Sequence, residues 1–237
     1  MALVPGGTYE PFFARKSTKE GVDLLIPEII KVKPFWLDRT AVTNDQFLAF
    51  VITHPEWRKS AARPIFAEAH YLDRWPNDAS WGEAGAANKP VTGVSWFAAE
   101  AYCEAKGLTL PTTDQWEYAL ADKGRNAAKV RESILDWYSR PNPTTLPGVD
   151  ASEPNGFEIS GLVGVVWEWT EDFSAAMAGP ELRNSGGKNK DLFCGGASLG
   201  AKDASDYAAF MRYSFRASLK ATYTTPNLGF RCAKEAS

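Results

Sequence analysis

Residues 90–119 read PVTGVSWFAAEAYCEAKGLTLPTTDQWEYA, and this stretch holds two consecutive helix signals. Ser95 is a favourable N-cap for a helix over Trp96–Lys106, and Gly107 offers the left-handed conformation in which many helices end. Thr112 begins a second helix, because a glutamine three residues later completes a capping box. The stretch therefore predicts two short helices in direct succession.

The flanking sequence contains few other regular elements. A capping box at Thr43 opens a further helix, and the alternating run between Pro27 and Pro34 predicts an edge strand. Residues 142–155 and 174–190 are rich in turn-forming residues and predict surface loops. No composition change marks a domain border, so we expect one loop-rich α+β domain over residues 1–237 with few short helices and strands.

Composition excludes several classes of protein. The 237 residues include 26 basic and 29 acidic side chains, a net charge of −3, which does not suit the broad basic face of a nucleic-acid binder. No run of about 18 apolar residues could cross a membrane. Two histidines and three cysteines without metal-ligand spacing disfavour structural zinc. The sequence predicts neither a nucleic-acid partner nor membrane insertion.

Six segments of the chain, in order, resemble the formylglycine-generating enzyme (sulfatase-modifying factor) superfamily. They are 90–96, 101–103, 107–119, 164–172, 195–198 and 227–233. The likeness runs from Pro5 to Ala233 and is closest to the nitrite-reductase-associated and pyoverdine-maturation branches. It implies an elaborated C-type-lectin-like fold with little regular secondary structure.

The same resemblance indicates that the family's copper chemistry is lost. Formylglycine-generating members carry two cysteines that bind copper and attack the substrate, followed by two arginines. The arginine pair here is Arg212 and Arg216, and counting back places the cysteine positions at Asp203 and Ala208. Neither side chain is a thiol, the soft ligand and nucleophile that this chemistry needs, and no cysteine lies between residues 195 and 231. We expect no copper at a two-cysteine site.

Each of the three cysteines has its own interpretation. Cys103 and Cys232 match the two structural cysteines of the family, so the resemblance implies a disulfide between them, with two buried thiols as the alternative. Cys194 is interpreted as a lone buried thiol rather than a nucleophile, because neither histidine falls in a matching active-site segment.

The resemblance also bears on a calcium site and on the Trp-Glu-Trp motif at residues 167–169. Relatives bind calcium through Asn and Asp side chains and backbone carbonyls. This chain keeps Asn155 but has Gly161 and Val165 where relatives have oxygen ligands, so calcium is possible at a weakened site only. In the family the Trp pair packs the core, and Glu168 is expected to satisfy buried backbone donors.

Residues 203–212 occupy the segment that lines the substrate cleft in relatives. Asp203, Asp206, Tyr207 and Arg212 are the candidate catalytic residues, because carboxylates and a phenol can transfer protons, orient a substrate or ligate a hard metal. The alternative is structural, with Asx-turns at the two aspartates and ion pairs to the arginines.

An aromatic rim is the second candidate site. Trp57, Tyr71 and Trp75 could line a loop rim that binds a flat ligand or a peptide. The alternative is that these rings hold loops against the core, as aromatic side chains commonly do in a Trp-rich domain.

Two functional hypotheses follow. The first is a maturation or oxidation step on a small molecule or partner protein, without a copper-thiolate centre. The second is a non-catalytic accessory module that docks a partner such as a metalloenzyme, and genuine formylglycine formation ranks last. The first residues already predict a strand and a turn, so we expect a mature periplasmic or secreted form, with a cytoplasmic location as the alternative.

Overall fold

The computed structural model describes most of the chain. The described residues are 1–10, 16–19, 22–25, 29–125, 127–141, 143–173 and 218–236.

The predicted helix starts are confirmed. α1 (Asn44–Thr53) and α3 (Thr113–Ala121) each begin with a complete capping box. α2 (Trp96–Glu104) begins at Ser95, whose hydroxyl accepts from the backbone N–H of Ala98. α2 ends two residues earlier than predicted, and Gly107 takes the expected left-handed conformation, at φ 67°. Two short 3-10 helices, η1 (Pro55–Trp57) and η2 (Asp122–Gly124), follow α1 and α3.

One helix was missed. Residues Ala127–Ser139 form α4, although we expected only loops and short strands between the third helix and residue 142. Val130, Ile134 and Leu135 lie on its inner side and pack into the core, at the three- and four-residue spacing of an amphipathic helix. Trp137 stacks on Trp167 with the ring centroids 4.7 Å apart. The apolar stripe is short and is interrupted by charged residues of the exposed face, so the sequence did not indicate a helix here.

The strands are short and join distant parts of the chain. β1 (Ala2–Val4), β6 (Phe35–Leu37) and β9 (Ala233–Glu235) form an antiparallel sheet in the order β1-β6-β9, so both ends of the domain meet in one sheet. β7 (Trp167–Glu168) and β8 (Leu228–Gly229) pair in parallel.

Two antiparallel hairpin-like pairs complete the strands. β3 (Lys16–Lys19) pairs with β4 (Val22–Leu25), and β2 (Gly7–Tyr9) pairs with β5 (Ile30–Val32). β5 confirms the strand predicted between Pro27 and Pro34, and β2 is the only described strand that pairs with it. Pairing on one side among the described strands fits the predicted edge strand.

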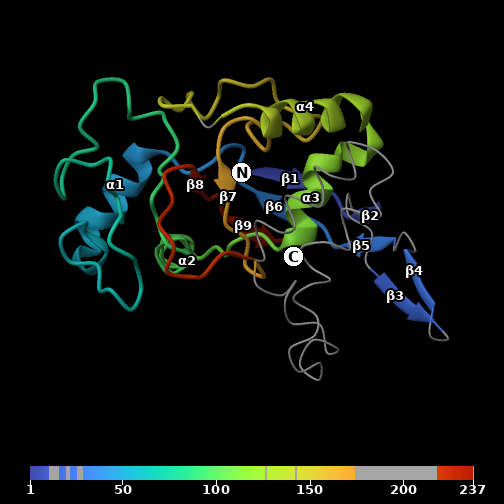
Figure 1. Ribbon diagram of the computed structural model, residues 1–237, viewed down its shortest axis with the longest axis horizontal. Coiled ribbons are helices and arrows are strands. Elements are labelled where there is room, and N and C mark those ends of the chain that lie inside the picture. The colour runs from blue at the N-terminus through green and yellow to red at the C-terminus, as the bar shows by residue number, and fades with distance from the viewer. Residues whose placement is uncertain are drawn as a thin grey trace.

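Figure 1 shows how these elements are arranged. α1 and the long loops that follow it form one end of the molecule, the sheet β1-β6-β9 lies in the middle, and α3 and α4 lie beside that sheet. Long connections and short elements dominate, which confirms the loop-rich α+β class.

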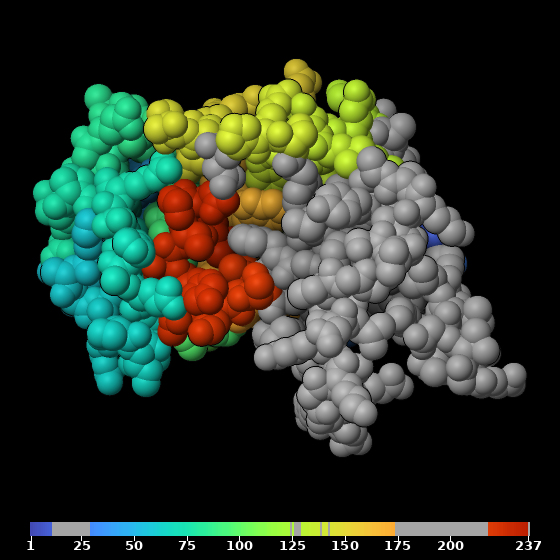
Figure 2. Space-filling view, in the orientation of Figure 1, coloured from blue at the N-terminus to red at the C-terminus, as the bar shows by residue number. Residues whose placement is uncertain are grey.

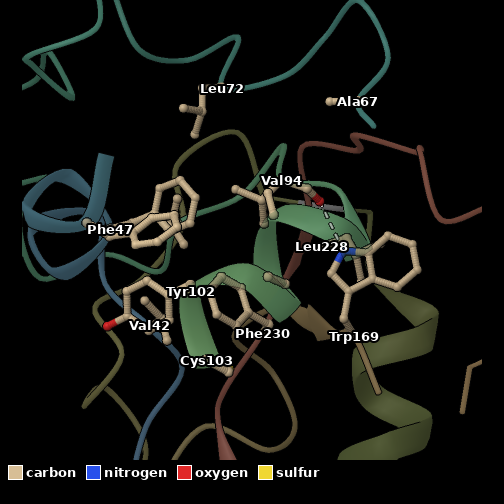
Figure 3. Packing of buried hydrophobic residues seen from close by; sticks show 14 of the residues in the cluster. Val42, Phe47, Ala67, Leu72, Val94, Tyr102, Cys103, Trp169, Leu228 and Phe230 are labelled. Atoms are coloured by element: carbon tan, nitrogen blue, oxygen red, sulfur yellow. Dashed lines mark hydrogen bonds between the residues drawn. The ribbon is translucent and has the colours of Figure 1, made fainter. Parts of the chain in front are cut away.

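The main hydrophobic core lies between α1, α2 and the C-terminal segment. Phe47, Tyr102 and Phe230 pack their rings together, with centroids 5.3 to 6.1 Å apart (Figure 3). Trp169 is fully buried, and its indole N–H donates to the Val94 carbonyl at 2.9 Å. A second cluster joins the inner faces of α3 and α4 to the N-terminal strands.

None of the described helices is both long and apolar enough to cross a bilayer.

Candidate functional site

The Trp-Glu-Trp motif builds a buried ionic centre. The side chains of Glu168 and Arg231 are fully buried, and Arg231 Nε and Nη2 donate to the two carboxylate oxygens at 2.8 Å each. Trp116 Nε1 donates to Glu168 Oε2 at 2.7 Å. The other arginine donors reach the backbone carbonyls of Asp38 and Ser160, each at 3.0 Å. Because every partner is internal, this centre holds the scaffold together.

The structural interpretation of Glu168 is therefore confirmed, with one correction. We expected backbone donors, but two side chains donate to its carboxylate, the Arg231 guanidinium and the Trp116 indole. A guanidinium neutralises a buried carboxylate, which neutral backbone N–H groups do not.

The disulfide implied by the resemblance is present. Cys103 on α2 and Cys232 next to β9 are bonded, across 129 residues of sequence, and both are fully buried. The backbone N–H of Cys232 also donates to Asp38 Oδ2 at 3.0 Å. Burial raises the pKa of the Asp38 carboxyl, against the lowering effect of that hydrogen bond. This corner anchors α2 to the C-terminal strand.

Asn155 organises the loop in which it lies. Its Oδ1 accepts from the backbone N–H groups of Phe157 at 2.9 Å and Ile159 at 3.2 Å, and its Nδ2 donates to the Ala119 carbonyl. Calcium at Asn155 stays a prediction, and the ion would have to compete with two backbone donors for that oxygen. Within the described ranges, no three His, Cys, Asp or Glu side chains gather as a metal-binding group.

The prediction of an exposed aromatic rim is wrong for Tyr71 and Trp75, two of its three residues. Tyr71 and Trp75 are 4% and 2% exposed and belong to the main core, with Trp57 packed against it. Trp75 Nε1 donates to the Asn44 side chain, and the Tyr71 hydroxyl donates to the Trp57 carbonyl. The rings hold loops against the core, as the alternative interpretation states. The Tyr71 hydroxyl and the Trp75 indole N–H each have an internal acceptor, so both rings can be buried without leaving a polar atom unpaired.

The candidate catalytic residues lie in a part of the chain that the structure does not describe. Asp203, Asp206, Tyr207 and Arg212, together with Cys194, fall within residues 174–217. Their roles stay predictions.

A groove in the described residues was not anticipated from the sequence. Three segments line it: 68–74, 92–93 and 223–226, around a cavity of about 430 Å³. That volume lies in the range of small-molecule sites. Figure 2 shows the C-terminal segment, in red, lying against residues of the loop-rich end of the molecule on the visible face.

Backbone hydrogen bonds fix the three segments to one another. The N–H of Glu68 donates to Thr222, that of Leu72 to Gly93, and that of Gly93 to Thr225, at 2.9 to 3.0 Å. Leu72 has a left-handed backbone, at φ 48°, although its side chain is branched and fully buried in the core. A conformation that is unfavourable for leucine persists only where packing imposes it, so this wall of the groove is held rigidly.

Polar and charged groups converge on the groove. Glu68, Asp73 and Arg74 are exposed at its rim, and Glu68 Oε1 accepts from the Thr222 hydroxyl at 3.3 Å. His70 Nδ1 lies 3.2 Å from Asp73 Oδ2 in an exposed pair. Sequence spacing gave no signal for this set, because its members come from segments about 150 residues apart and follow no motif.

Known proteins resemble the chain over nearly its whole length. Residues 1–236 match the sulfatase-modifying factor enzyme 1-like domain. The chain is 29% identical to a formylglycine-generating enzyme of Streptomyces coelicolor, over 87% of this chain and 80% of that protein. It is 28% identical to "Inactive C-alpha-formylglycine-generating enzyme 2" of Mus musculus, over 100% and 86%. The crystal structure of CarF aligns with a TM-score of 0.51 at 16% identity, over 100% and 98% of the two chains, a likeness of fold.

Proposed function

This chain belongs to the sulfatase-modifying factor enzyme 1-like family, and we propose that it is a member that does not make formylglycine. One observation carries the proposal: no cysteine occurs between residues 195 and 231, where relatives have their catalytic pair. The described part of the chain has the Cys103–Cys232 disulfide that the resemblance implies and a buried Glu168–Arg231 ion pair. These features support a folded member of the family that lacks the cysteine pair.

We infer that the protein carries out a maturation or oxidation step on a small molecule or a partner protein, without a copper-thiolate centre. The candidate groups are Asp203, Asp206, Tyr207 and Arg212. A carboxylate beside a guanidinium stays ionised and can accept a proton or hold an ammonium, and a phenol can orient a ring. We propose a periplasmic or secreted location, in which the disulfide would be stable.

A second function is a non-catalytic accessory module that docks a partner such as a metalloenzyme. The similarity over the whole chain to a mouse relative whose name calls it inactive supports this alternative. A fold that has lost one chemistry can keep its surface for binding.

Mass spectrometry of candidate metabolites and partner peptides, incubated with and without the protein, separates the two functions. A mass change that requires the protein and is lost in Asp206→Asn or Tyr207→Phe supports the enzyme. A partner that co-purifies while every substrate keeps its mass contradicts the enzyme and supports the module.

A further inference from the structure

Two threonine hydroxyls at the groove lack hydrogen-bond partners. Oγ1 of Thr224 and Oγ1 of Thr225 are buried and unpaired among the described residues, and Thr224 is 6% exposed. Buried polar atoms in folded proteins nearly always have a partner, so two neighbouring exceptions need a physical cause. Both threonines line the groove at segment 223–226.

A ligand in the groove would supply the missing partners. The hydroxyl and the methyl group of threonine are similar in size, so rotation about χ1 exchanges them with little change in shape. Both residues line the groove, so a ligand bound there is a candidate partner for the rotated hydroxyl. In the free protein each hydroxyl costs stability, and pairing with a ligand would remove that cost.

The rim carries charges of both signs. Glu68 and Asp73 are acidic, and Arg74 has no carboxylate partner in the described part of the chain. Two carboxylates repel a ligand that is only anionic, and the guanidinium repels one that is only cationic. A ligand with one charge of each sign fits this rim best.

We propose that the groove binds a small zwitterion with the chemistry of a free amino acid. The Arg74 guanidinium pairs with the carboxylate of the ligand, in the two-pronged geometry that arginine favours. Glu68 and Asp73 hold its ammonium group. The hydroxyls of Thr224 and Thr225 rotate to bond its polar atoms, and Tyr223 and Pro226 contact its apolar part. None of the residues that line this groove belongs to segment 203–212, and its ligand binds whether or not the chain is an enzyme.

Isothermal titration of the whole protein with each of the standard L-amino acids tests the proposal. We expect saturable binding of at least one of them with a Kd of about 1 mM or tighter, equivalent to about 4 kcal/mol. The N-acetyl and the amide derivative of that amino acid each lack one charge and should bind about tenfold more weakly or worse. Absence of saturable binding for the whole set, or equal binding of the N-acetyl and amide derivatives, overturns the proposal.

Variants localise the binding to the groove. Thr224→Val keeps the shape and removes an unpaired buried hydroxyl, so the protein should be as stable as the wild type or more so, while binding weakens about tenfold. Arg74→Gln should weaken binding similarly, and Arg131→Gln, an exposed change on α4, is the matched control and should leave it unchanged. If Thr224→Val and Arg74→Gln both bind as the wild type does, the ligand lies elsewhere and the proposal fails.

Discussion

Replacing Glu168 by Gln should destabilise the fold far more than neutralising a carboxylate at the exposed surface. The substitution keeps the shape of the side chain but leaves the fully buried Arg231 guanidinium without its counter-ion. Gln presents one acceptor oxygen to three donor groups, Nε and Nη2 of Arg231 and Nε1 of Trp116. Breaking a buried pair in this way costs about 3 to 5 kcal/mol.

Urea unfolding followed by tryptophan fluorescence measures this cost. The free energy of unfolding should fall by about 3 to 5 kcal/mol, and the melting temperature by about 6 to 20 °C for a chain of this size. Glu158→Gln is the matched control, because Glu158 pairs with Arg39 at the exposed surface, with 68% and 52% of the two side chains accessible. That pair should contribute under about 1 kcal/mol.

If Glu168→Gln costs no more than Glu158→Gln, the buried pair does not hold the scaffold together, and the structural interpretation of the Trp-Glu-Trp motif is wrong.

Three further predictions concern other parts of the chain. Burial raises the pKa of the Asp38 carboxyl above 3.8. The stability that its neutral form contributes is therefore complete below about pH 4 and is lost as pH rises through the raised pKa. Unfolding measured against pH should show this loss in the wild type and not in Asp38→Asn. Non-reducing peptide mapping should link Cys103 to Cys232, and reduction should lower the free energy of unfolding by about 4 to 5 kcal/mol for so long a loop, a result that two free thiols in native material would contradict. Asp206→Asn or Tyr207→Phe should reduce turnover or partner binding about tenfold, about 1.4 kcal/mol, with folding unchanged in thermal melts; unchanged function in both, with loss of stability, would make the two residues structural.

Local signals in the sequence predicted the local structure well. The capping boxes at Thr43 and Thr112 and the Ser95 N-cap involve residues three positions apart, so the sequence alone contains the whole interaction. Gly107 is similar, since its left-handed backbone is a property of the residue itself. The disulfide came from the family resemblance, because spacing within one chain does not reveal which cysteines meet.

Long-range features were harder to predict. The burial of Tyr71 and Trp75 depends on α1 and η1. The Asn44 side chain of α1 accepts the Trp75 indole N–H, and the Trp57 carbonyl of η1 accepts the Tyr71 hydroxyl. The groove depends on Thr224 lying beside segment 68–74, which hydrogen bonds between Glu68 and Thr222 bring about across more than 150 residues. Neither contact leaves a periodic pattern, so hydrophobic spacing could not anticipate either one.

The most direct measurement is the conversion of a peptide containing Cys-x-Pro-x-Arg to its formylglycine form. The protein is incubated with the peptide and Cu(I) under air, beside the formylglycine-generating enzyme of Streptomyces coelicolor as the positive control, and the products are identified by mass spectrometry. Since Asp203 and Ala208 stand where the resemblance places the cysteine pair, we predict that the peptide keeps its thiol while the control converts it. Aldehyde formation by this protein, abolished by Cys194→Ser, would contradict the loss of formylglycine chemistry and make Cys194 the catalytic thiol.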